Sequence, residues 1–300
     1  GGGMNGKSRK ILAFDIGGTK IAHALVDENG RLLTERMKDN TPKTASEIFA
    51  LLKDITARCE DDIDAVGIAT AGEVDCDNSR IIGSVGNMPA GYRDTAFYKL
   101  SGKPVFVEND ANAVMWAEYK AGAAKGCKNA MVIAIGTGLG LGVMVDGRLL
   151  KGKSGLGAEA HFGIARGKVR RCSCGNWDCY EVYASGTALG VDAQEAYHDK
   201  SKTSHDIIAG IQAGDKKARE VFDLWQDDVL TGIVGLANLF DPEVVLMFGG
   251  LTDYLDYERL EKEANSRIVT APFKLCRARF EHNAALIGAA LIALHNLEVK

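Results

Sequence analysis

Three apolar runs that each end in a turn of small residues are the feature that most limits how this chain can fold. The turns are Gly17-Gly18-Thr19, Gly136-Thr137-Gly138 and Gly249-Gly250. Glycine lets the backbone approach an anion closely, so that N–H groups can point at phosphate oxygens. In α/β proteins, ligands bind at the carboxyl ends of strands, which is where all three turns are expected. Together the turns predict a phosphate-binding protein.

The first two turns occupy corresponding positions in an internal repeat. Residues 16–33 and 135–150 both contain a glycine turn, an apolar strand and a final Gly-Arg-Leu-Leu. Any two glycine-turned hairpins share some of this pattern, but a repeat of such long period favours two related domains. Strand and helix patterns alternate along the chain, which indicates the α/β class. We expect a smaller domain from residues 1–116 plus 284–300 and a larger one from residues 117–283.

Hydrophobic periodicity and end signals predict the individual elements. The residue Thr44, followed by Glu47, reads as a capping box at the start of a helix. Asp241-Pro242 should end the best amphipathic helix. The expected strands are 11–15, 21–26, 65–70, 104–107, 131–135 and 244–248, and the expected helices are 45–55, 111–124, 217–240 and one from 284.

Two aspartates follow strands directly and are candidates for chemistry. Asp15 precedes the first glycine turn and could hold Mg²⁺ through water, or could merely tie down its own turn. Asp110 follows the strand that ends near Val107 and precedes a helix. It could accept a proton as a general base, or it could be an N-cap, and the sequence alone leaves both readings open.

Three clustered cysteines point to a metal site. Cys172, Cys174 and Cys179 offer thiolates within one short segment, and a fourth ligand would complete a tetrahedral zinc site. The alternative is a set of buried thiols around a turn. The other cysteines are scattered, which is typical of reduced cytoplasmic proteins rather than disulfide frameworks.

Charge and hydropathy exclude several other classes of protein. The net charge of −4 argues against non-specific attraction to nucleic acid or to an anionic membrane. The longest apolar run, 284–294, is shorter than the roughly 18 residues that a membrane span needs. No secretory signal is visible, and Gly1-Gly2-Gly3 before Met4 is typical of a cloning remnant. We therefore expect a soluble cytoplasmic protein.

The chain resembles the actin-like ATPase superfamily and, more narrowly, the ROK family of repressors, open reading frames and sugar kinases. The resemblance rests on Asp15-Ile-Gly-Gly-Thr-Lys20, Glu108-Asn-Asp-Ala-Asn-Ala113, Gly136-Thr-Gly-Leu-Gly-Leu-Gly142, Cys172-Ser-Cys-Gly-Asn-Trp-Asp-Cys-Tyr-Glu181 and Phe248-Gly249-Gly250. It implies two actin-like (ribonuclease H-like) domains, with ATP and a sugar in the cleft between them. It also implies a homodimer.

The resemblance assigns roles to residues of these motifs. It implies that Asp110 is the general base of an ATP-dependent sugar kinase that uses Mg²⁺. Sugar contacts are implied for Gly72, Asn87, Asn109, Asp110, Glu159, His161 and Glu181. ATP contacts are implied for Asp15, Gly17, Gly18, Thr19, Lys20, Gly136, Thr137, Gly138, Gly249 and Gly250.

One motif departs from the family pattern. The family takes the fourth zinc ligand from Glu-x-Gly-His, whereas this chain reads Glu159-Ala160-His161-Phe162. Without a gap, Phe162 falls on the histidine position. Either a one-residue slip returns His161 to the metal or the ligand is absent, and we favour the slip because three retained cysteines make little sense without metal. Such a zinc would be structural, with no open coordination position.

The identity of the sugar stays open. The segments 69–74 and 87–92, which should line the sugar pocket, both depart from the commoner family pattern. We expect phosphorylation of the 6-hydroxyl of glucose, with N-acetylmannosamine or N-acetylglucosamine as the alternative and a non-catalytic sugar sensor as a further one. The family's repressors carry a DNA-binding domain ahead of the first glycine turn. Only 14 residues precede Asp15 here, fewer than the ~40 that a domain needs, so we expect no such function.

Overall fold

The computed structural model describes residues 7–300, and the expected remnant at Gly1-Gly2-Gly3 lies outside this range. The chain divides into two compact units. The first unit runs to Gly126 and also contains Leu149–Ala158 and Arg279–Lys300, and the second contains Cys127–Arg148 and Glu159–Ala278. The bounds of these units differ from the expected domains, which were 1–116 plus 284–300 and 117–283. Residue 116 lies inside a helix that packs along the last helix of the chain, so the whole helix stays with the first unit.

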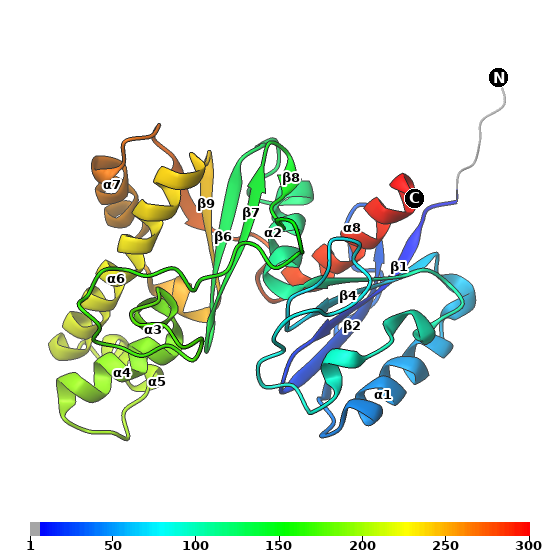
Figure 1. Ribbon diagram of the computed structural model, residues 1–300, viewed down its shortest axis with the longest axis horizontal. Coiled ribbons are helices and arrows are strands. Elements are labelled where there is room, and N and C mark those ends of the chain that lie inside the picture. The colour runs from blue at the N-terminus through cyan, green and yellow to red at the C-terminus, as the bar shows by residue number, and fades with distance from the viewer. Residues whose placement is uncertain (1–6) are drawn as a thin grey trace. The chain divides into compact units, whose positions relative to one another are not determined.

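The first unit is built on a mixed five-stranded sheet of order β3-β2-β1-β4-β5. Strands β1 and β2 form an antiparallel hairpin, and β4 and β5 continue parallel to β1. Figure 1 shows α8, in red, along one face of this sheet and α1 on the other. The elements are β1 Lys10–Ile16, β2 Lys20–Asp27, β3 Met37–Asn40, α1 Ala45–Ala57, β4 Ala65–Thr70, β5 Val105–Asn109, α2 Asp110–Ala121 and α8 Ala284–Val299, with short 3₁₀ turns at Glu60–Asp62, Tyr92–Asp94, Phe97–Leu100 and Glu281–Asn283.

The second unit repeats this topology. Its sheet has the order β10-β9-β6-β7-β8, with an antiparallel β6–β7 hairpin followed by the parallel strands β9 and β10. The predicted repeat is therefore present as two sheets of matching strand order. The elements are β6 Ala130–Ile135, β7 Leu139–Val145, β8 Arg148–Leu149, α3 Glu181–Ala184, α4 Gly186–Tyr197, α5 Ser204–Gln212, α6 Lys216–Phe240, β9 Val244–Phe248, a 3₁₀ turn Gly250–Tyr254, α7 Tyr257–Arg267 and β10 Lys274–Arg277.

The final helix, α8, is buried over most of its length because its residues are apolar nearly all round. It packs on α2, β4 and β1 of the first unit. A Cβ added at Gly288 would lie 1.8 Å from the carbonyl oxygen of Ala113, so glycine permits the close contact with α2. The predicted cap of α1 is confirmed on the threonine side, since the Thr44 hydroxyl accepts from the Glu47 backbone N–H at 3.2 Å.

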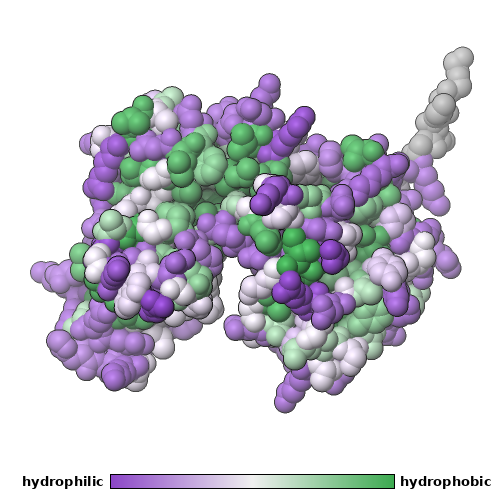
Figure 2. Space-filling view, in the orientation of Figure 1, coloured by the Kyte–Doolittle hydropathy of each residue, from purple (hydrophilic) through white to green (hydrophobic). Residues whose placement is uncertain are grey.

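The surface is mixed in character. On the face shown in Figure 2, hydrophilic residues alternate with smaller hydrophobic areas on both units. Within residues 7–300, none of the helices combines the length and the apolar composition that crossing a lipid bilayer requires. The fold is α/β with two mixed sheets.

Candidate functional site

Two carboxylates lie close together in the first unit. Asp15 stands near the carboxyl end of β1, and Asp110 is the first residue of α2, which follows β5. Burial, together with the nearby Asp110 carboxylate and against a smaller opposing effect of Arg36, raises the pKa of Asp15 to about 6. Burial of its carboxyl group also raises the pKa of Asp110, although the residue as a whole is exposed to solvent. Two neighbouring carboxylates, one partly buried and one on an exposed residue, suit a site that binds a cation or transfers a proton.

Asn109 is the N-cap of α2, which answers the question that the sequence left open for Asp110. The Asn109 side-chain oxygen accepts from the backbone N–H groups of Ala111 and Asn112, at 3.0 and 3.3 Å. Its amide donates to the carbonyl oxygen of Gly72 at 2.7 Å. The carboxylate of Asp110 accepts a local bond from the Ala111 N–H at 2.8 Å. Asp110 therefore projects beside the cap instead of serving as the cap.

The first glycine turn lies in the same corner. The Gly17 N–H donates to the Lys20 carbonyl at 3.0 Å, which closes the turn of the β1–β2 hairpin. A Cβ added at Gly18 would lie 3.5 Å from Cβ of Asn87, so the turn lies directly against this residue. Thr19 is exposed, and the Lys20 ammonium contacts Asn40. The first unit thus brings together Asp15, the glycine turn, Gly72, Asn87, Asn109 and Asp110.

The other two glycine turns lie side by side in the second unit. Gly249 has φ +118°, and a Cβ there would lie 2.0 Å from the carbonyl oxygen of Ile135, so only glycine fits. Gly136, Thr137 and Gly250 line a cavity of about 760 Å³ that lies wholly within the second unit. This volume is within the range of small-molecule and cofactor sites.

Most of the cavity wall was not predicted from the sequence. It comes from one side of α4, from the loop before α5, from α5 along its length and from the 3₁₀ turn after β9. The Thr187 hydroxyl donates to the Thr137 carbonyl at 2.8 Å, which ties α4 to the second glycine turn. These residues have no common pattern in the sequence, and the local signals are the helix caps, Ser185 before α4 and the Thr203–Asp206 capping box of α5. The wall residues missed include Thr187, Gln194, Lys202, His205, Gln212 and Tyr254.

His161 joins the three cysteines, as the one-residue slip predicted. The four ligand atoms lie within 4.8 Å of one another. His161 Nδ1 lies 3.4 Å from Sγ of Cys172, and the Sγ atoms of Cys174 and Cys179 are 3.5 Å apart. Ligands at the usual Zn–S and Zn–N lengths around a tetrahedral ion are roughly 3.5–3.8 Å apart, so the cluster fits zinc. The alternative of buried thiols fits poorly, because Cys174 is exposed.

Glu181 connects this cluster to the second glycine turn. His161 Nε2 lies 3.6 Å from a carboxylate oxygen of Glu181, while the other ring nitrogen faces the cysteines. A Cβ at Gly138 would lie 3.2 Å from the other carboxylate oxygen. Phe162 turns away to stack on Tyr180, with ring centroids 5.1 Å apart. Glu159 is exposed, and it is the first residue of the Glu159–Ala278 part of the second unit.

Comparison with known proteins identifies the family. The ROK family description matches residues 11–296. This chain belongs to the ROK family. It is 32% identical to a glucokinase of Streptomyces coelicolor, over 94% of this chain and 96% of that protein. It is 31% identical to an N-acetylmannosamine kinase of Salmonella typhi, over 94% and 97%.

A solved structure agrees with both the fold and the family. The ROK family glucokinase of Streptomyces griseus, in complex with glucose and AMPPNP, is 31% identical and superposes with a TM-score of 0.80. The match covers 95% of this chain and 99% of that one. The membership expected from the motifs is therefore confirmed.

Proposed function

We propose that this protein is an ATP-dependent hexose kinase, with glucose as its first candidate substrate. The observation that carries the proposal is the corner of the first unit, where Asp110 projects beside the α2 cap and close to Asp15. The named relatives support it, since a glucokinase and an N-acetylmannosamine kinase are both similar to this chain over nearly its full length.

In the proposed reaction, Asp110 is the general base. As the sugar hydroxyl oxygen forms a bond to the γ-phosphorus of ATP, the bond to the leaving ADP oxygen breaks and Asp110 accepts the hydroxyl proton. The α2 N-terminus and the Asn109 cap hold the base on a rigid element. Asn109 also orients Gly72, and we assign Gly72, Asn87 and Asn109 to sugar contacts.

The nucleotide is proposed to bind through the glycine turns and the cavity of the second unit. Gly136, Thr137 and Gly250 would take phosphates, and the cavity would take the nucleoside. Asp15 would hold Mg²⁺ with the help of water, since a hard cation suits a carboxylate crowded by a second one. When bound, Mg²⁺ supplies charge neutralisation for the phosphates.

Zinc is proposed to be structural, held by His161, Cys172, Cys174 and Cys179. With four protein ligands it would keep no open position for substrate. Its role would be to brace Glu181, which contacts His161 and, with Glu159, is assigned to the sugar. A carboxylate on the second nitrogen of a metal-binding histidine is a common means of fixing the ring.

Several broader assignments accompany this proposal. We propose that both units are actin-like ATPase domains, because each contains the same hairpin and parallel-strand order. We also propose a cytoplasmic homodimer that binds no nucleic acid. The seven free cysteines support a reducing compartment. Light scattering of the purified protein would test the dimer.

The deciding experiment measures ADP release from MgATP with glucose, mannose, allose, N-acetylglucosamine and N-acetylmannosamine, for the wild type and for Asp110→Asn. We expect the wild type to phosphorylate one of these sugars. If Asp110 is the general base, Asp110→Asn should lower this turnover by at least about 10²-fold while sugar binding persists. Equal turnover in both proteins would contradict the role of Asp110, and no turnover by zinc-loaded wild type would favour a sugar sensor.

N-acetylhexosamines are the second candidate substrates because of the segment 87–92. This segment ends in Tyr92, whose hydroxyl bonds to Thr70 at 2.6 Å in the interior of the first unit. Tyr92 therefore anchors the loop that carries Asn87, in a segment that departs from the commoner family pattern. The same sugar panel separates the two candidates.

A further inference from the structure

A buried carboxylate lies immediately before the proposed catalytic residues. Glu108 is the second-to-last residue of β5, next to Asn109, and it is 1% exposed. One of its oxygens accepts from the Asn109 backbone N–H at 2.8 Å and from Asn112 Nδ2 at 3.3 Å. Its other oxygen accepts from Asn78 Nδ2 at 2.7 Å. A buried carboxylate is costly in free energy unless it is paired and hydrogen-bonded, so Glu108 needs a cationic partner here.

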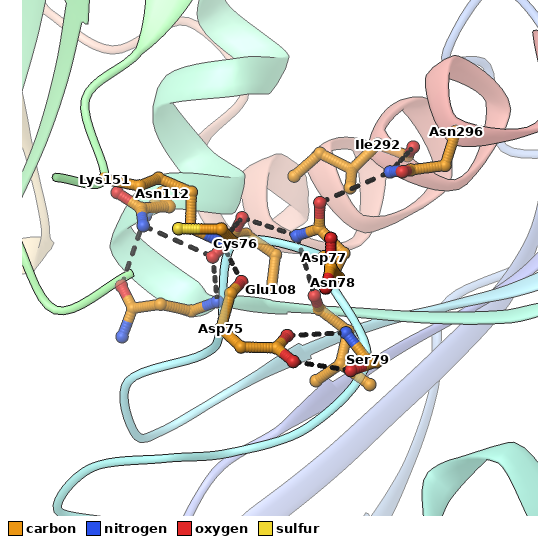
Figure 3. Close-up of polar contacts among 12 residues, drawn as sticks. Asp75, Cys76, Asp77, Asn78, Ser79, Glu108, Asn112, Lys151, Ile292 and Asn296 are labelled. Atoms are coloured by element: carbon orange, nitrogen blue, oxygen red, sulfur yellow. Dashed lines mark hydrogen bonds and ion pairs between the residues drawn. The ribbon is translucent and has the colours of Figure 1, made fainter. Parts of the chain in front are cut away.

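Lys151 supplies that cation from a distant part of the sequence. Its ammonium lies 3.0 Å from the Glu108 carboxylate, and the two side chains are only 12% and 2% exposed. The same ammonium donates to the Asp75 carbonyl oxygen at 2.6 Å. Figure 3 shows Lys151 reaching Glu108 and the backbone of the 75–79 turn. One nitrogen therefore links the strand that ends before Asp110 to the loop that follows Gly72.

The segment that carries Lys151 fits closely on this loop. Gly155 has φ +99°, and a Cβ there would lie 2.4 Å from the carbonyl oxygen of Val74, so a larger residue would not fit. The thiol of Cys76 contacts the Gly152 carbonyl at 3.6 Å. Residues Leu149–Ala158 belong to the first unit for this reason, although both flanking stretches belong to the second.

We infer that Lys151, acting through Glu108 and the Asp75 carbonyl, is a positioning residue that sets Asn109, Asp110 and Gly72 for the sugar acceptor. The inference rests on the proposed function. Three side-chain contacts join the corner to the loop: Asn109 to Gly72, Asn78 directly to Glu108, and Glu108 through Lys151 to Asp75. These contacts lie in the first unit beside residues assigned to the sugar, whereas the cavity assigned to the nucleotide lies in the second unit.

The test compares Lys151→Met with Lys153→Met, a matched change at an exposed lysine of the same segment. We expect Lys151→Met to lower kcat by about 10²-fold and to raise the KM for sugar, because small misplacements of reacting groups are costly. The KM for MgATP should stay within about twofold in both variants. Lys151→Arg, which keeps the charge, should recover part of the loss. Lys151→Met kinetics equal to those of Lys153→Met would overturn the inference.

A second variant guards against simple misfolding. Lys151→Met alone leaves a buried unpaired carboxylate, whereas Glu108→Gln/Lys151→Met removes both charges and should recover stability. Its sugar kinetics should stay impaired, because the tie to the Asp75 carbonyl is still missing. If the double variant regained both stability and kinetics, Lys151 would merely neutralise Glu108, and the positioning role would be wrong.

Hydrogen exchange gives a readout that does not depend on activity. In Lys151→Met, amides of residues 72–78 and 149–158 should exchange faster, while amides of β6 and β9 in the second unit should not change. If the wild type phosphorylates no sugar in the panel, the proposed function fails by itself. The inference is then tested by the affinity for glucose and by the amide exchange rates. If Lys151→Met changed neither of them, the inference would be overturned.

Discussion

Asp15 and Asp110 lie close together in the proposed catalytic corner, and their proximity has a cost in stability. Burial and the neighbouring carboxylate raise the pKa of Asp15 to about 6 from 3.8. Between these pH values the folded chain binds a proton that the unfolded chain has released. Stability therefore falls as pH rises through this interval, and the full penalty applies above it. Active sites often retain such unfavourable groups because the chemistry needs them.

Replacing this carboxylate should stabilise the protein at high pH. We expect Asp15→Asn, in Mg²⁺-free buffer, to raise the free energy of unfolding at pH 8 by up to about 3 kcal/mol, and the gain to vanish near pH 4. Urea denaturation at both pH values measures this. Asp61→Asn, at an exposed carboxylate, is the control for the substitution itself. A gain of equal size at both pH values would argue against the titration of Asp15 as its cause.

At the scale of elements, the segment between β8 and α3 contains little regular structure. Apart from its close packing at residues 149–158, it is held by isolated bridges such as Gly163 to Cys179 and Arg171 to Trp177. Buried Asp178 adds to this, since its carboxylate accepts from the backbone N–H groups of Lys168, Val169 and Arg170. A metal on His161 and the cysteines would supply the remaining restraint. The segment should thus depend on zinc more than the sheets do.

Removal of zinc should therefore act locally. Chelation is expected to weaken sugar binding by about tenfold or more, through loss of the His161–Glu181 arrangement, and to leave nucleotide binding unchanged. Calorimetric titration of each ligand before and after chelation measures this. Cys172→Ser should lose zinc, whereas Cys127→Ser, outside the cluster, should retain it. Loss of nucleotide affinity in parallel with sugar affinity would contradict a local role.

At the scale of the whole molecule, the chain ends contribute to one unit. Strand β1 and helix α8 lie at opposite ends of the sequence, yet they pack together in the first unit. Helix α8 also packs against α2, which carries Asp110 at its start. The stability of the proposed catalytic corner thus depends on the last residues of the chain.

A single methyl group in this contact should be disruptive. Gly288→Ala would place a Cβ 1.8 Å from the Ala113 carbonyl oxygen, so α8 must shift, at a cost of about 1–3 kcal/mol in the free energy of unfolding. Gly235→Ala in α6, where a Cβ meets nothing within 4 Å, should be neutral or stabilise by up to about 1 kcal/mol. Urea denaturation of both variants measures the difference, and equal stability would contradict the tight α8–α2 contact.

Much of the fold could be predicted because burial follows local periodicity. The expected strand 65–70 coincides with β4, and the expected helix 217–240 begins one residue earlier in the structure, at Lys216. Helix α2 ends at Ala121, short of the expected residue 124, because Gly122 caps it. The exact first and last residues of an element depend on capping interactions, which hydrophobic periodicity does not predict.

The candidate site was predicted in part. The glycine turns and Asp110 could be found because each lies directly after an apolar strand. The cavity wall could not, because it is assembled from β6, α4, α5 and the turn after β9. Glu108 and Lys151 are separated by 43 residues, and neither carries a local signal of pairing.

Local patterns of apolar, small and ligating residues predict six of the strands, four of the helices, the repeat and the cysteine cluster. Packing in three dimensions sets the rest: Asn109 caps α2, His161 rather than Phe162 faces the cysteines, and Lys151 pairs with Glu108. Each of these depends on where distant segments pack. The partner of a buried charged or metal-binding side chain is the group that packs next to it. Spacing along the chain does not specify that group.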